Sequence, residues 1–114
     1  MSILKPRQPR QFIVQIEGNI QWQTAREPTT GVWIGVSPQL NLNASGDTWG
    51  ELTEAMNEAT AMLLTDLLES GQLGTFLREH GWQSSPLPAP GKRVKFDVPL
   101  SLSQARSVRE LIPA

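Results

Sequence analysis

The strongest structural signal in this sequence is a helix whose two ends are both marked. Thr48 and Glu51 form a T-x-x-E capping box, in which the threonine hydroxyl accepts a hydrogen bond from the amide of the third helical residue. Asp47 places negative charge at the positive end of the helix dipole, and Gly71 supplies the left-handed residue that ends many helices. Between these ends, apolar residues recur at spacings of three and four: Leu52, Ala55, Met56, Ala59, Leu63 and Leu67. The rest of the chain must therefore offer a surface that buries this stripe.

The residues before the helix alternate as β-strands do. Runs 12–17 and 20–26 flank Gly18-Asn19, a pair typical of two-residue hairpin turns, so we predict a hairpin there. Two further strands are predicted at 32–37 and 40–44, where apolar residues occupy alternate positions. We therefore expect an α+β fold, in which an antiparallel sheet of three or four strands is covered on one face by one main helix, in the order β-β-β-α-β.

With 114 residues the chain has the size of one domain. Residues 1–10 are interpreted as a basic N-terminal arm, 11–82 as the α+β domain, 83–92 as a proline-rich linker, and 93–114 as a C-terminal strand and short helix. In the last segment Val94, Phe96 and Val98 alternate with other residues, which predicts a strand. Too few residues follow for the second helix of a DNA-binding module, so a sheet extension or a dimer arm is favoured.

Charge and composition exclude several classes of protein. Residues 47–79 carry seven acidic residues and one basic residue, Arg78, whereas both ends of the chain are basic, so direct nucleic-acid binding by the body of the domain is disfavoured. The chain has no cysteine, no long apolar segment and no signal-peptide pattern. We expect a cytoplasmic protein that does not enter the membrane.

The sequence carries no pattern that predicts an enzyme. His80 is the only histidine, and its place beside Gly81 is typical of a helix cap or a packing residue. No phosphate-binding loop or zinc-protease motif is present, and the predicted strands hold too few carboxylates for a two-metal site. We therefore predict no catalytic residue, no metal and no cofactor.

Two sets of residues are candidates for binding a partner. Glu51, Glu54 and Glu58 share one helical face, which is usually a solvated face and, if functional, suits a basic partner. Trp22 and Trp33 are placed on strands of a sheet that one helix covers on one face only. Their rings fill the chain's own core or a homodimer contact, or else they meet another protein, because a large bare apolar patch is uncommon.

A longer motif links these elements to a known family. Ser37-Pro38, followed by a short strand and then by Gly46, Asp47, Thr48 and Glu51, resembles the corresponding stretch of the HicB-like antitoxins, and the likeness extends from about Phe12 to Trp82. The resemblance implies a degraded ribonuclease H-like domain. It also implies a non-catalytic role, in which the chain binds and masks a small basic toxin ribonuclease of the HicA type. Independently of the resemblance we expect a homo-oligomer, because a second copy would cover the sheet face that one helix leaves bare.

One alternative stays open beside the antitoxin prediction. The tail has the strand-then-helix beginning of a ribbon-helix-helix half, with Arg93 and Lys95 alternating along the strand, but the second helix is missing. The chain is then an orphan homo-oligomeric regulatory module that binds nucleic acid through its basic arm and tail. Nucleic-acid affinity of this kind falls steeply with salt.

Overall fold

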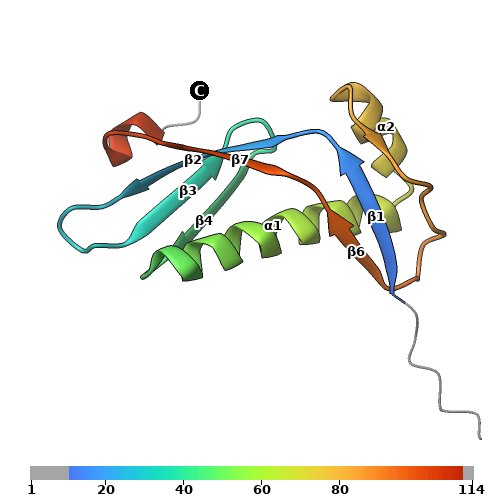
Figure 1. The fold of residues 1–114 in the computed structure, drawn as a ribbon, viewed down its shortest axis with the longest axis horizontal. Helices are drawn as coiled ribbons and strands as arrows, with labels where there is room; N and C mark the ends of the chain where they lie inside the picture. Colours follow the sequence, from blue (N-terminus) through green and yellow to red (C-terminus); the bar gives the residue numbers. More distant parts are fainter. Residues whose placement is uncertain (1–10, 112–114) are drawn as a thin grey trace, which may run out of the picture.

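The computed structural model describes residues 11–111, so the predicted basic arm at 1–10 lies outside the described residues, as do residues 112–114. The elements, in chain order, are β1 (Phe12–Glu17), β2 (Ile20–Arg26), β3 (Trp33–Ser37), β4 (Leu42–Gly46), α1 (Trp49–Glu69), α2 (Leu73–Glu79), β5 (Gln83–Ser84), β6 (Val94–Asp97), β7 (Leu100–Gln104) and the 3-10 helix η1 (Val108–Leu111). The predicted α+β class is confirmed, with one long helix lying along the strands (Figure 1).

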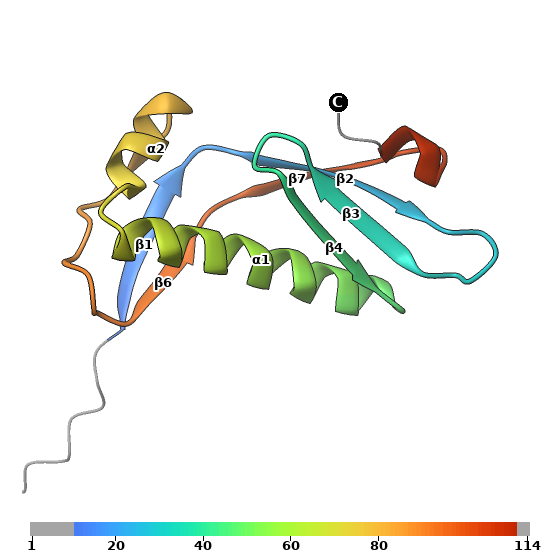
Figure 2. The same cartoon turned by 180° about the vertical axis from the view of Figure 1, so that it is seen from behind.

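The strands form two mixed sheets rather than one antiparallel sheet. The first has the order β5-β1-β6 and the second β4-β3-β2-β7. Within them, β6 runs parallel to β1 and β7 runs parallel to β2, whereas β5 with β1, β2 with β3, and β3 with β4 are antiparallel. Figure 2 shows the C-terminal strands passing from one sheet to the other beside the N-terminal strands. The C-terminal segment thus extends both sheets.

The hairpin predicted at Gly18-Asn19 is wrong. The primed turn that joins hairpin strands needs φ > 0 at its central residues, and neither Gly18 nor Asn19 has a positive φ. The chain instead bends there and passes from the first sheet to the second. A Cβ atom on Gly18 would overlap the indole ring of Trp82, so the glycine is needed for this close approach rather than for a turn.

Helix α1, 21 residues long, connects the two sheets by covering both. Its first half packs on the second sheet in a core that contains Ile20, Trp22, Leu52 and Met56. Its second half packs on the first sheet in another core: Val14, Ile16, Leu64, Leu68, Leu73 and Leu77. The buried positions along the helix are Leu52, Met56, Thr60, Leu64 and Leu68, so the predicted stripe was right at its start and displaced by one residue further on.

Both predicted ends of α1 are confirmed. The Thr48 hydroxyl accepts a hydrogen bond from the Glu51 amide (3.1 Å). The Glu51 carboxylate accepts one from the amide of Asp47 (2.9 Å), whereas in a standard capping box it would accept from the amide of the N-cap residue, Thr48. At the other end Gly71 has φ 74°, and the amides of Gly71 and Gln72 donate to the carbonyls of Leu68 and Leu67. This pair of hydrogen bonds is the Schellman motif. It provides donors for two carbonyls that have no partner within the helix.

Thr48→Ala should lower the free energy of unfolding by about 1 kcal/mol, because the Glu51 amide loses its acceptor at the helix end. Thr53→Ala is the matched control, since the Thr53 hydroxyl only returns a hydrogen bond to the Gly50 carbonyl within the helix. Urea unfolding followed by circular dichroism measures both. Equal losses in the two variants would contradict the assigned cap.

The sheet face away from α1 is covered in part by the C-terminal segment. Helix η1 packs on β2 and β3, and Leu111 and Ala25 are both buried. The chain's own tail therefore covers this face at one end of the second sheet. The remainder of this face on β2 is polar, with Gln21 and Gln23 exposed.

Candidate functional site

The most distinctive surface of the described chain is the exposed side of α1. We call it the α1 outer face and define it by six exposed residues: Glu51, Glu54, Glu58, Met62, Asp66 and Glu69. Helix α1 contains no lysine, arginine or histidine. Of the three carboxylates predicted here, Glu54 and Glu58 are one helical turn apart, a spacing at which like charges repel.

The carboxylates of this face differ in how far the chain itself uses them. Glu51 is engaged in the helix cap, and the Glu69 carboxylate accepts the Gly91 amide (3.1 Å). Among residues 11–111, Glu54 and Glu58 have neither a hydrogen-bond partner for their carboxylates nor an ion pair. They are therefore the two carboxylates of the predicted set that are open to a partner.

Trp22 was wrongly placed among the partner-binding residues. Its side chain is fully buried under the first half of α1, where the core alternative put it. Its indole Nε1 has no hydrogen-bond partner, and neither has the buried hydroxyl of Ser37. The reason is the phase of β2, in which Ile20, Trp22 and Thr24 turn towards the helix while the glutamines between them turn away.

Trp33 lies at the start of β3 and is only partly buried. Its ring meets the ring of Trp49 edge to face, with centroids 5.1 Å apart, and the Arg26 guanidinium lies 5.9 Å from the Trp33 centroid. Trp49 is 42% exposed. The sequence prediction missed Trp49; its position directly after the N-cap, outside the apolar stripe, was the available signal.

The loop before Trp33 is held by Glu27. Its carboxylate accepts the amides of Thr29 and Thr30, at 3.1 Å and 2.6 Å, and the Thr30 hydroxyl at 2.7 Å. These hydrogen bonds, chiefly the one from the Thr30 amide, lower the pKa of Glu27. The carboxylate of Glu27 is thus engaged within its own turn.

Arg93 and Lys95, the candidates for nucleic-acid contact, are both exposed on or beside β6. Lys95 lies with Asp97 at a groove of about 450 Å³ between α1 and β6, which Asn57 and Thr60 also line. Asp97 lies two residues from Lys95 on the same side of the strand, and its carboxylate offsets the positive potential of Lys95. The described part of the tail therefore offers no continuous basic stripe.

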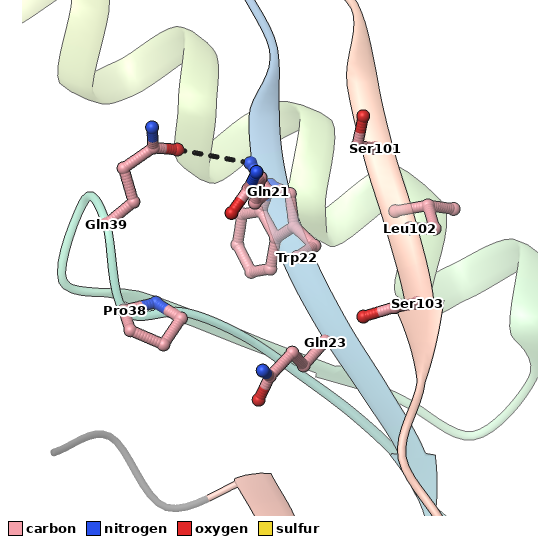
Figure 3. Close-up of a pocket in the computed structure, with 8 residues that line it drawn as sticks. All are labelled: Gln21, Trp22, Gln23, Pro38, Gln39, Ser101, Leu102 and Ser103. Carbon is pink, nitrogen blue, oxygen red and sulfur yellow. Dashed lines mark hydrogen bonds between the residues drawn. The ribbon is translucent and has the colours of Figure 1, made fainter. Parts of the chain in front are cut away.

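A second groove, of about 510 Å³, crosses β2 and β7 on the sheet face opposite α1. Its polar lining comes from Gln21, Gln23, Gln39, Ser101 and Ser103. Figure 3 shows the Gln39 side chain reaching across to the Gln21 amide, which donates to its oxygen (3.2 Å). The groove is lined by neutral amides and hydroxyls, so it has hydrogen-bonding groups without a charged one.

His80 caps α2 and packs between aromatic rings. Its Nδ1 lies 2.8 Å from the Phe76 carbonyl, and its ring stacks obliquely on Phe76 and Trp82. Within residues 11–111 no three histidine, aspartate or glutamate side chains gather as metal ligands would. No helix in the same range is both long and apolar enough to cross a membrane.

Comparisons with protein-family models, with curated proteins and with solved structures find no match to this chain.

Proposed function

We propose that this chain is a non-catalytic binding protein that captures a small basic protein on the α1 outer face. The observation that carries this proposal is the pair Glu54 and Glu58, which are exposed and have no ion pair with any other residue of the described range 11–111, on a helix that contains no cation. A cationic partner would relieve the repulsion between them and would be steered to the helix by its field.

The middle of the same face offers an apolar contact. Met62 is 67% exposed and lies one turn beyond Glu58. A flexible, polarisable methionine surrounded by carboxylates suits a partner whose basic residues frame an apolar patch. The α1 outer face therefore combines carboxylates, which select a basic partner, with Met62, whose burial by that partner would stabilise the complex.

The class of partner follows from the family resemblance. The motif from Gly46 to Glu51 resembles that of HicB-like antitoxins, which supports a small basic toxin ribonuclease of the HicA type as the molecule captured. On this proposal the chain acts in the cytoplasm as a homo-oligomer with a ribonuclease H-like α+β domain, and it inhibits the toxin by masking its active surface.

The test is affinity capture from the cells that make the protein, using the wild type and the variant Glu54→Lys/Glu58→Lys. The wild type should retain a stoichiometric basic partner of about 6–10 kDa, the size that the family resemblance implies and one that charge steering favours. The ribonuclease activity of that partner, purified and assayed on RNA, should fall when the wild-type chain is added. The double charge reversal should abolish both effects.

Glu17→Lys/Glu79→Lys is the matched control, because it makes the same change in net charge at exposed acids outside α1. This variant should bind the partner as the wild type does. Equal capture by the two double variants would overturn the proposed face. Retention of nucleic acid alone, lost on neutralising Arg93 and Lys95, would instead support the regulatory alternative.

A further inference from the structure

The described chain has four outer sheet strands, and three of them are protected in the ways that natural proteins use. Helix α1 packs along β4, β5 has only two residues, and β6 carries the exposed charges of Lys95 and Asp97. Strand β7 differs, because its five residues, LSLSQ, include no charge and no proline. An edge without such protection is a ready template for another strand.

Two backbone hydrogen bonds fix which groups of β7 face its neighbour β2. The Ile20 amide donates to the Pro99 carbonyl (3.1 Å), and the Ala105 amide donates to the Thr24 carbonyl (2.8 Å). The direction of the backbone N–H and C=O groups alternates along a strand, so those of Ser101, between these two points, are directed towards β2. The N–H and C=O groups of Leu100, Leu102 and Gln104 are then directed away from β2, at the open edge of the sheet.

The side chains of β7 match this open edge. Leu102 is paired in register with Trp22, yet 44% of it is exposed. Figure 3 shows its side chain pointing away from the β2 residues. The outer strand therefore presents an apolar side chain and unpaired backbone groups at the same place.

We propose that β7 pairs in antiparallel fashion with β7 of a second copy of this chain, about a twofold axis at Leu102. In this register Leu102 lies opposite Leu102 of the partner subunit, and Leu100 lies opposite Gln104 of the partner subunit. Each outward-facing residue then donates one backbone hydrogen bond and accepts another. The two four-stranded sheets become one continuous sheet across the axis.

A second copy is the fitting occupant because the strand is complementary to itself. Residues 98–105 carry no charge, so pairing the strand with its own copy brings no like charges together. The contact also brings the two exposed Leu102 side chains side by side on one face. This inference rests on the homo-oligomer of the proposed function and names the strand that forms it. It uses a different surface from the α1 outer face, so loss of the dimer and loss of partner capture are measured separately.

Sedimentation equilibrium of the purified full-length chain tests the proposal. At micromolar concentrations the wild type should have twice the chain mass of 12.6 kDa. This concentration range is expected because a contact of one strand with its copy has a modest area and binds weakly. Leu102→Lys should weaken the dimer by about tenfold or more, since it places two like charges across the axis. Gln23→Lys, which adds the same charge on β2, should leave the dimer unchanged, and circular dichroism should show both variants folded. A monomeric wild type, or a Leu102→Lys dimer of unchanged affinity, would overturn the proposal.

Cross-linking tests the register itself, because the chain has no cysteine of its own. Leu102→Cys should form an intersubunit disulfide under mild oxidation, since a hydrogen-bonded antiparallel pair places the Cα atoms about 5.5 Å apart. Gln104→Cys should not, because its counterpart in the partner lies four residues along the strand. Cross-linking of Gln104→Cys without that of Leu102→Cys would contradict the twofold axis at Leu102.

Discussion

Trp22→Ala should lower the free energy of unfolding by about 3–5 kcal/mol, the largest loss we expect from a single side chain. The indole is fully buried and packs with Leu52 and Met56 beneath the first half of α1. Removing it leaves a cavity that the two sheets and the helix cannot fill. Since a domain of this size is stable by about 5–15 kcal/mol, the loss is a large part of the total.

Urea unfolding followed by far-ultraviolet circular dichroism measures this loss without relying on tryptophan fluorescence. Ser37→Ala is the control, because its buried hydroxyl has no partner and its removal should change the free energy of unfolding by less than about 0.5 kcal/mol, or raise it. A near-neutral Trp22→Ala would mean that Trp22 lies on the surface, as the partner-binding hypothesis supposed.

Gly46→Ala is the second change with a large expected effect, lowering the free energy of unfolding by about 1–3 kcal/mol. A Cβ atom at Gly46 would lie 2.5 Å from the Leu52 backbone nitrogen and 2.8 Å from the Glu51 carbonyl carbon. Both atoms belong to the first turn of α1, which cannot move aside as a side chain can. The strand and the helix would have to separate where β4 leads into α1.

Gly50→Ala is the matched control for this prediction and should have the opposite sign. At Gly50 the nearest atom to an added Cβ is the Thr48 hydroxyl oxygen, at 3.9 Å, so there is room for the methyl group. Alanine in a helix is favoured over glycine by about 0.5–1 kcal/mol. Thermal unfolding of the two variants should shift in opposite directions; a stabilising Gly46→Ala would refute the close contact.

The candidate surface was predictable in part. Glu54 and Glu58 were placed correctly on an exposed face, because helical periodicity alone determines which residues share a side. Trp22 was assigned to the wrong environment, since alternation along β2 separates two faces without saying which of them the helix covers. Trp49 was missed because its neighbour, Trp33, is brought to it by β3 and not by nearby sequence.

The sequence by itself determined the main helix, its two ends and the four strand segments before it, the last of them displaced by two residues. Each of these depends on interactions within a few residues, such as the bond from the Glu51 amide to Thr48 or the left-handed Gly71. Only the tertiary structure decided which strands pair. Residues 94–104 lie about 80 positions after β1 and β2, and their parallel pairing with both replaces the local hairpin. The physical reason is that backbone hydrogen bonds are alike for every strand, so the partner is chosen by how α1 and the two cores pack and not by the local pattern of residues.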